Sequence, residues 1–253
     1  MLDWQPPHAQ WFVDGKLNAS VNCVDRHARG PRRNKAALIW VPEPEAEEPV
    51  AITYRDLYHR VNEFAALLRD ECGLRAGDRV TLHMPMVPEL PVTMLACARL
   101  GAIHSVVFGG FAPAELATRI NDAKPKVIIS ASCGIEVAKV LPYKPMLDAA
   151  IDLSAHKPDA TLIFQRPQVA ADLKPGRDHD WAKLRSDAAG DHVLGHHVEE
   201  RPLPLARRDD VVHGRERAIR ACHFPSALAE GVERLGARHL VHEVETDEEL
   251  CLP

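Results

Sequence analysis

Two adjacent glycines lie where an apolar segment gives way to the start of a helix. The run Ser105–Phe108 leads into Gly109 and Gly110, and Pro113 follows shortly after. Glycines at such a turn let a ligand approach the backbone without a Cβ in the way, and a helix N-terminus offers free N–H groups to an anion such as phosphate. The residues therefore indicate a turn that could hold a phosphate-bearing ligand. A plain strand-to-helix turn would look the same, because one Gly-Gly pair is not the GxGxxG pattern.

The other chemically reactive residues do not match the spacing of a phosphate loop, a cysteine pair or a zinc site. The sequence contains no GxxxxGK[ST] phosphate loop, and its six cysteines are scattered without a CxxC pair. His192, His196 and His197 lie close together and Cys222–His223 could join them, but no second Cys/His pair follows at zinc-site spacing. We therefore predict no metal site and no catalytic residue, and we interpret the histidines as part of a solvated tail.

Strand-like and helix-like segments alternate along the chain. Thr53 and Asp56 resemble a capping box that opens a helix, Gly73 can end that helix, and Gly101 can end the helix that follows Pro88. Strands are expected at 36–41, 50–53, 80–84, 103–108, 126–130 and 161–164, and helices at about 57–68, 90–100, 113–122 and 144–153. The first two strands should form a hairpin. The strand 103–108 is rich in β-branched and aromatic residues and should be covered on both faces.

This alternation predicts an α/β fold: a doubly wound, mostly parallel sheet with helices on both faces. Ligands of such sheets collect at the carboxyl ends of the strands. We expect this domain to span residues 1–190. Residues 191–253 have a different character, because all nine lysines occur at or before Lys183, whereas this tail holds eight arginines and seven of the 14 histidines. The tail is either a flexible, disordered surface extension or out-of-frame translation of a GC-rich gene, and the DNA sequence would decide between these.

Composition narrows the classes of partner. The net charge of −5 and the aromatic content of 5% argue against a nucleic-acid-binding protein. The N-terminus lacks the pattern of a secretory signal, and no apolar run approaches the roughly 20 residues that span a bilayer. We therefore expect a cytoplasmic chain with small-molecule partners and no nucleic-acid or membrane partner.

Several long motifs resemble the AMP-forming short-chain acyl-CoA synthetases, the family of acetyl- and propionyl-CoA synthetases. The matching segments occur in the family's order and cover residues 4–185; they are WFVDGKLNASVNCVDRHA (Trp11–Ala28), GDRVTLHMPMVPEL (Gly77–Leu90) and MLACARLGAIHSVVFGGFAPAELATRI (Met94–Ile120). SASCGIE (Ser130–Glu136) and YKPMLDAAI (Tyr143–Ile151) are more similar to the propionyl branch. The resemblance implies part of the N-terminal subdomain of the adenylate-forming enzyme fold.

The resemblance also implies site residues. In that family the GGF turn approaches the nucleotide end of coenzyme A, which corresponds here to Gly109, Gly110 and, more loosely, Phe111. Lys139 stands where the family has an arginine that contacts the CoA phosphates. A lysine can still pair with phosphate, as a point charge. A solvated surface lysine is the alternative reading.

The family's reaction joins a short carboxylate, ATP and CoA into acyl-CoA, AMP and pyrophosphate, with Mg²⁺ organising the triphosphate. The family's Ser/Thr/Gly-rich phosphate loop, ribose-binding aspartate and catalytic lysine have no counterpart in this sequence. We therefore expect the chain to bind no ATP or Mg²⁺ and to be inactive alone. The alternatives are a non-catalytic module that binds the CoA nucleotide, or a frameshifted product without function. Apolar surface left uncovered in such a fragment should favour self-association.

Overall fold

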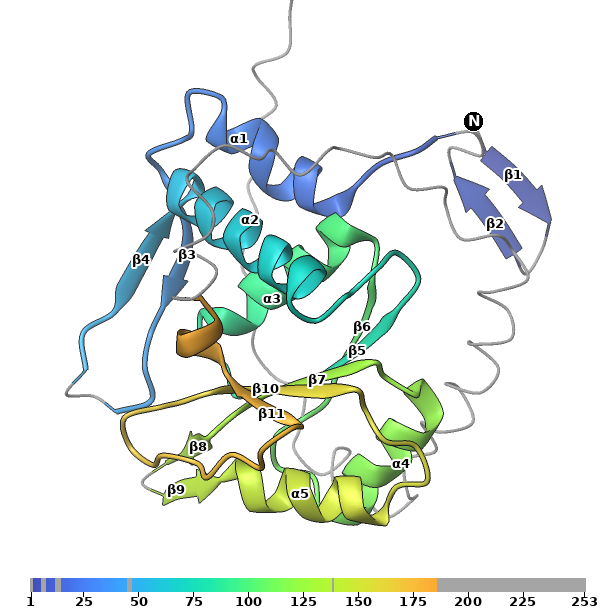
Figure 1. Ribbon diagram of the computed structural model, residues 1–253. Helices are drawn as coiled ribbons and strands as arrows, with labels where there is room; N and C mark the ends of the chain where they lie inside the picture. The colour runs from blue at the N-terminus through green and yellow to red at the C-terminus, as the bar shows by residue number, and fades with distance from the viewer. Residues whose placement is uncertain (1, 6–7, 12–14, 45–46, 138, 186–253) are drawn as a thin grey trace, which may run out of the picture. The chain divides into compact units, whose positions relative to one another are not determined.

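The computed structural model describes residues 2–5, 8–11, 15–44, 47–137 and 139–185 (Figure 1). A five-stranded sheet with the strand order β11-β10-β7-β5-β6 lies at its centre. All four strand pairs of this sheet are parallel. Its strands are β5 (Arg79–His83), β6 (Ile103–Val106), β7 (Val127–Ala131), β10 (Ala160–Phe164) and β11 (Asp178–Asp180). The predicted parallel sheet is confirmed. The tail expected at 191–253 lies outside the described residues.

Helices cover both faces of this sheet, as the alternation predicted (Figure 1). The helices α2 (Tyr54–Asp70) and α3 (Glu89–Leu100) share one apolar core with Val127 and Ile129 of the sheet. The helices α4 (Pro113–Ala123) and α5 (Tyr143–Leu153) share a second core with Ile128 and Ile163. Side chains of a strand alternate between its two faces, so neighbouring residues of β7 enter different cores.

Local signals fix the ends of these helices. The hydroxyl of Thr53 accepts a hydrogen bond from the Asp56 N–H at 3.2 Å, so the expected cap opens α2. Gly73 and Gly101 both adopt the left-handed backbone conformation, with φ of 60° and 72°, just after α2 and at the C-cap of α3. Glycine adopts this conformation without steric cost, which is why both helices stop where the sequence indicates.

Among the described residues, three two-stranded antiparallel hairpins accompany the sheet. The hairpin of β3 (Ala36–Trp40) and β4 (Val50–Thr53) was predicted. Two others were not: β1 (Leu2–Gln5) with β2 (His8–Trp11), and β8 (Cys133–Glu136) with β9 (Lys139–Pro142). A short helical segment, η1 (Val21–Asp25) continued by α1 (Arg26–Ala28), precedes β3.

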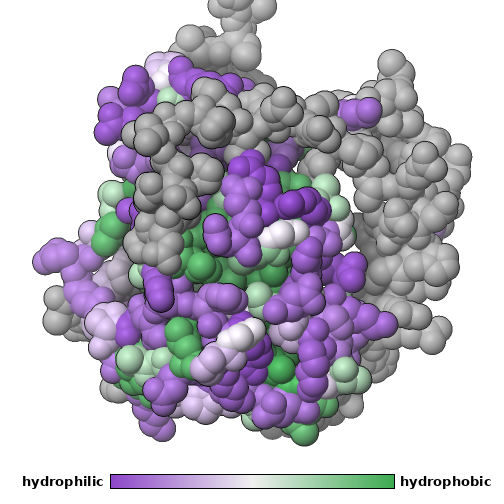
Figure 2. Space-filling model, viewed as in Figure 1, coloured by the Kyte–Doolittle hydropathy of each residue, from purple (hydrophilic) through white to green (hydrophobic). Residues whose placement is uncertain are grey.

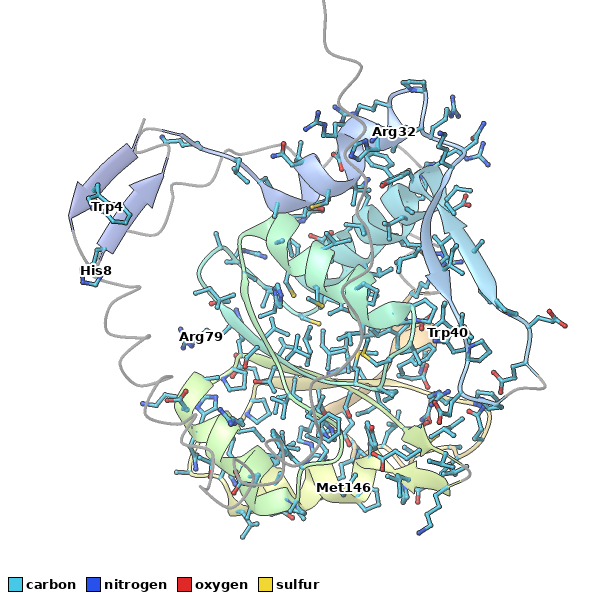
Figure 3. The ribbon with its side chains drawn as sticks, turned by 180° about the vertical axis from the view of Figure 1, so that it is seen from behind. Trp4, His8, Arg32, Trp40, Arg79 and Met146 are labelled. Atoms are coloured by element: carbon cyan, nitrogen blue, oxygen red, sulfur yellow. The ribbon has the colours of Figure 1, made fainter. Side chains whose placement is uncertain are left out.

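Side-chain hydrogen bonds to backbone carbonyls fasten neighbouring elements to the sheet. The indole nitrogen of Trp40 donates to the carbonyl of Met86 at 2.8 Å, which ties β3 to the segment after β5 (Figure 3). Arg79, at the start of β5, donates from Nε to the carbonyl of Ala123 at 2.6 Å and so holds the end of α4 (Figure 3).

The prediction for residues 103–108 was wrong in two respects. The strand β6 ends at Val106, and its faces are not both covered: Ile103 is 59% exposed, Val106 is 47% exposed, and Phe108, just beyond the strand, is 67% exposed. The strand also lies at an edge of the sheet, where β5 is its only partner among the described residues. A β-branched and aromatic run indicates a strand but not which segments cover it, because packing is a long-range property.

Candidate functional site

The glycine turn lies at the carboxyl edge of the parallel sheet, where ligands of such sheets bind. Val107 N–H donates to the carbonyl of Leu82 at 2.8 Å, so the chain leaves β6 beside the end of β5. The Phe111 N–H then closes a tight turn on the carbonyl of Phe108 at 3.2 Å. The helix α4 starts two residues later with Pro113 in its first turn. The expected strand–glycine–helix arrangement is therefore present.

The space beside each glycine is filled by a side chain of this chain. A Cβ on Gly109 would overlap the phenol of Tyr143, and a Cβ on Gly110 would lie 2.5 Å from a ring carbon of Phe108. Gly134, in β8, also faces the Tyr143 phenol. Tyr143 therefore packs between the glycine turn and the β8–β9 hairpin. The sequence suggested that these positions are glycine so that a ligand can approach the backbone. The structure adds a second reason: a larger residue would collide with the aromatic rings of Tyr143 and Phe108.

Aromatic rings and a cation gather on the outside of the turn. The rings of Phe108 and Phe111 lie edge to face, with centroids 5.7 Å apart. The guanidinium of Arg119, on α4, lies 5.9 Å from the centroid of Phe111. Phe108 is largely exposed. The turn thus presents an accessible π-face beside a positive charge, a combination that suits a base next to a phosphate. Sequence analysis named Phe111 but missed Phe108 and Arg119.

Lys139 opens β9 and lies opposite Glu136 of β8 in the hairpin register. Both side chains are exposed. The hairpin tip is strained, because Val137 has a φ of 57°, a left-handed conformation that disfavours β-branched residues. The Val137 N–H donates to the Glu43 carboxylate at 3.1 Å, which helps to hold the tip. Lys139 is therefore available to an anion, with a carboxylate as its cross-strand neighbour.

A buried polar cluster beneath the turn was not predicted. His83, at the end of β5, is fully buried and has Nδ1 3.1 Å from the hydroxyl of Ser130 on β7. Its ring centroid lies 4.8 Å from that of Tyr143. Burial lowers the pKa of His83 to about 4, although the backbone of Gly109 acts against this shift. His83 is therefore neutral near pH 7. The strand-like sequence around His83 did not indicate that its ring would be buried beside Ser130 and Tyr143.

Metal ligands do not gather in this part of the chain. Among the described residues no group of three or more His, Cys, Asp and Glu side chains could hold a metal ion. His192, His196, His197 and the Cys222–His223 pair lie outside those residues. In the same described portion, no helix has the length and apolar character needed to cross a membrane.

A cavity of about 470 Å³ lies away from the glycine turn, between α2, α3 and the segment after β11. Its floor is apolar and includes Phe64 and Trp181, whose rings stack with centroids 3.8 Å apart. Its rim carries Arg185, which pairs with Glu63 at 2.7 Å. The rim charges are balanced between arginines and glutamates, so the cavity shows no preference for one charge of ligand.

Comparisons with known proteins place the chain in a family. The sequence model of the AMP-binding enzymes matches residues 24–210, and that of the acetyl-coenzyme A synthetase N-terminus matches residues 1–23. The first match extends past residue 185, where the resemblance was expected to end, into the lysine-free segment.

Similar proteins include the acetyl-coenzyme A synthetase of Gemmatimonas aurantiaca, 47% identical over 189 residues that make up 73% of this chain and 28% of that protein. The mitochondrial acyl-CoA synthetase short-chain family member 3 of Homo sapiens is 44% identical over 198 residues, 78% of this chain and 28% of that protein. The chain thus spans little more than a quarter of the length of these relatives.

A solved structure shares the fold. Acetoacetyl-CoA synthetase from Streptomyces lividans superposes with a TM-score of 0.65 at 25% identity, over 79% of this chain and 28% of that one. The family match covers most of the sequence, and the parallel sheet with helices on both faces agrees with it. The chain therefore belongs to the AMP-binding enzyme family, among the acyl-CoA synthetases.

Proposed function

We propose that this chain carries the CoA-nucleotide contact of a short-chain, AMP-forming acyl-CoA ligase of the propionate branch. The observation that carries the proposal is the exposed aromatic turn beside Arg119, at the carboxyl edge of the sheet. Short acyl groups are favoured by the names of the relatives and by the motifs Ser130–Glu136 and Tyr143–Ile151. In the complete reaction CoA supplies the thiol that accepts the acyl group from an acyl-adenylate, and Mg²⁺ accompanies ATP.

The described residues fit an adenine nucleotide. The rings of Phe108 and Phe111 offer a surface on which a base can stack. Arg119 and Lys139 offer charge-assisted hydrogen bonds to phosphate oxygens. Gly109 and Gly110 shape this turn, because they leave room for the rings of Tyr143 and Phe108 to pack beside it. These residues bind and orient a nucleotide; none of them performs a chemical step.

Calorimetric titration of the chain with CoA and with dephospho-CoA, which lacks the 3′-phosphate, tests this contact. Wild type should bind CoA more tightly. The variant Phe108→Ala should weaken both ligands, and Lys139→Gln should erase the difference between them. Lys16→Gln, which removes an exposed lysine from another part of the chain, is the matched control. No heat at millimolar CoA would overturn the proposal, and equal affinity of wild type for both ligands would overturn the role of Lys139.

Turnover is a separate question. We expect no pyrophosphate release when the chain is given propionate, ATP, Mg²⁺ and CoA, because ATP phosphates need clustered donors and cations that this sequence lacks. A coupled pyrophosphate assay checks this, and sustained release above a no-propionate control would contradict it.

We also propose that the chain self-associates through exposed apolar surface. Met86 is 84% exposed, and Ile103 and Phe108 are more than half exposed near the open edge of β6. Figure 2 shows apolar residues gathered near the middle of one face among polar ones. Sedimentation velocity should show a mass that rises with concentration, and Ile103→Lys should reduce that rise. A monomer at all concentrations would contradict the idea.

A further inference from the structure

Arg166, which follows β10, differs from the other buried cations of the described chain. Arg166 is only 8% exposed, and its Nη1 donates to the carbonyl of Cys133 at 3.3 Å. No carboxylate of the described residues lies within ion-pair distance of it. By contrast, Arg99 pairs with the buried Asp25.

Lys144, the other buried cation, is equally well compensated. Its ammonium lies 2.7 Å from the Asp148 carboxylate and 2.8 Å from that of Asp178. Removing a charge from water is costly unless it is paired, so buried cations normally have an anion beside them. One carbonyl dipole compensates a guanidinium only in part. Arg166 therefore keeps donors available for an anion.

A second donor lies close by. Tyr143 is 4% exposed, and its hydroxyl is packed against Gly109 and Gly134. The dipeptide Cys133–Gly134 connects the two groups: the carbonyl of Cys133 accepts from Arg166, and the bare Cα of Gly134 lies against the Tyr143 phenol. The guanidinium of Arg166 and the phenol of Tyr143 thus both lie against one stretch of β8.

The backbone around these donors is rigidly held by Ser132. The Arg166 N–H donates to the Ser132 hydroxyl at 2.8 Å, and the Tyr143 N–H donates to the Ser132 carbonyl at 3.0 Å. Ser132 follows β7 directly, so both donors sit at the carboxyl edge of the sheet. A site whose supporting residues are fixed in advance loses little entropy when a ligand binds.

The nearby charges do not replace an anion. Burial raises the pKa of Glu89, and Arg166 is among the arginines that act against this, yet the two form no ion pair. Glu136 is exposed at the tip of β8. The pKa of Tyr143 is raised, first by burial of the phenol and second by the negative charge of Glu136. The phenol therefore stays protonated near neutral pH and remains a donor. A guanidinium with free N–H groups and a phenolic O–H match the acceptors of a phosphate-type oxyanion.

We propose that Arg166 and the Tyr143 hydroxyl form a binding site for a phosphate-type oxyanion. The site goes beyond the CoA-nucleotide contact proposed above, because it uses neither Lys139 nor the outer face of the glycine turn. Its ligand is free phosphate or a phosphoryl group of a larger molecule.

Thermal unfolding in sodium phosphate, with ionic strength held constant by sodium chloride, tests the site. Phosphate should raise the wild-type Tm by about 3–8 °C at concentrations well above Kd. Acetate at the same ionic strength should have no effect; an equal shift with acetate would overturn the assignment to phosphate. No shift with phosphate would overturn the site.

The variant Arg166→Met separates a ligand site from a structural role. It should abolish the phosphate response without lowering the Tm in chloride, because it replaces an unpaired buried charge with an apolar side chain of similar length. Tyr143→Phe removes only the hydroxyl and should raise the apparent Kd for phosphate several-fold. Lys16→Gln, which removes an exposed lysine from another part of the chain, is the matched control and should respond like wild type. An intact response in Arg166→Met, or a fall in its Tm as large as that caused by Arg99→Met, would overturn the proposal.

CoA titration separates the two proposals. A phosphate response without CoA binding leaves the Arg166 site standing and removes the nucleotide contact. If the wild type binds CoA but shows no phosphate response, the Arg166 site is ruled out and the nucleotide contact stands. The same conclusion follows if the wild type binds CoA and Arg166→Met keeps a normal phosphate response.

Discussion

The phenol of Tyr143 occupies the space that a side chain on Gly109 would need: a Cβ there would lie 2.7 Å from the ring carbon Cε2 and closer still to the hydroxyl. Gly109 does not adopt a left-handed conformation, so alanine meets no backbone penalty there. We predict that Gly109→Ala costs about 1–3 kcal/mol of unfolding free energy through overpacking alone. Urea denaturation of the purified variant measures this.

A double-mutant cycle tests whether the phenol is the cause. Tyr143→Leu removes the ring, so Gly109→Ala should cost much less in that background, which gives a coupling free energy of about 1 kcal/mol or more. Gly134→Ala should couple to Tyr143→Leu in the same way. Gly30→Ala, where the nearest atoms belong to Arg26 and His27, should show no coupling. Additive effects of Gly109→Ala and Tyr143→Leu would rule out this explanation.

The parts of the fold that depend on local chemistry were predictable from the sequence. The cap at Thr53 and Asp56 lies within one helical turn, and the stop at Gly101 is a property of one residue. The β8–β9 hairpin was missed because its tip carries Val137, and a β-branched residue is rarely found in a tight two-residue turn. The edge position of β6 was missed because strand neighbours are set by distant segments.

The site was predictable only where a motif marks it. Gly109 and Gly110 predict a turn, and the family resemblance adds Phe111 and Lys139 to the predicted site residues. Tyr143 lies 34 residues after Gly109 in the sequence. Arg166 gives no signal of its own, because an arginine after a strand is normally solvated. Its burial depends on distant residues such as Cys133 of β8, whose carbonyl accepts from its Nη1 at 3.3 Å, and no single segment specifies such contacts.

The strain at Val137 predicts a stabilising substitution. Its φ of 57° costs a β-branched residue about 1–2 kcal/mol, whereas asparagine tolerates this conformation. Val137 is 87% exposed, so little apolar burial is lost. Val137→Asn should raise the unfolding free energy by about 1 kcal/mol in urea denaturation. Val140→Asn, in the adjoining strand and without a left-handed backbone, should lower it, and a loss of stability in Val137→Asn would argue against strain.

The buried ion pair of Asp25 and Arg99 predicts a large loss of stability. The two side chains are 1% and 5% exposed, and the pair joins the N-terminal helical segment to α3. Asp25→Ala should cost about 3–5 kcal/mol, because it leaves the Arg99 charge buried without a partner. Glu63→Ala breaks the exposed pair with Arg185 and should cost less than about 1 kcal/mol. Similar costs for the two variants in urea denaturation would show that burial does not set the difference.

The neutral state of His83 predicts a pH dependence of folding. Its pKa is about 4 in the folded chain, against an ordinary value near 6.5 when unfolded. Between these values the unfolded chain binds the extra proton, so stability is full above pH 6.5 and falls as the pH drops towards 4. The loss attributable to His83 is up to about 3 kcal/mol. His83→Gln should flatten the stability curve in this range, whereas the exposed His8→Gln should leave it unchanged; parallel curves for His83→Gln and wild type would refute the assignment.

The pairing of Lys139 with Glu136 predicts a variant with tighter CoA binding. Glu136 lies directly across the hairpin from Lys139, so its negative charge opposes the phosphate that Lys139 is proposed to bind. Opposite charges a few ångströms apart near a protein surface interact by roughly 1 kcal/mol or more, and the like-charge repulsion between Glu136 and phosphate has the same scale. Glu136→Gln should therefore lower the Kd for CoA about 2–5-fold in calorimetry, with a smaller gain for dephospho-CoA. Asp172→Asn, which neutralises an exposed carboxylate outside the hairpin, controls for the change in net charge. The gain should shrink at high salt, because exposed charges are screened. Unchanged or weaker CoA binding by Glu136→Gln would show that the β8–β9 hairpin takes no part in the nucleotide contact.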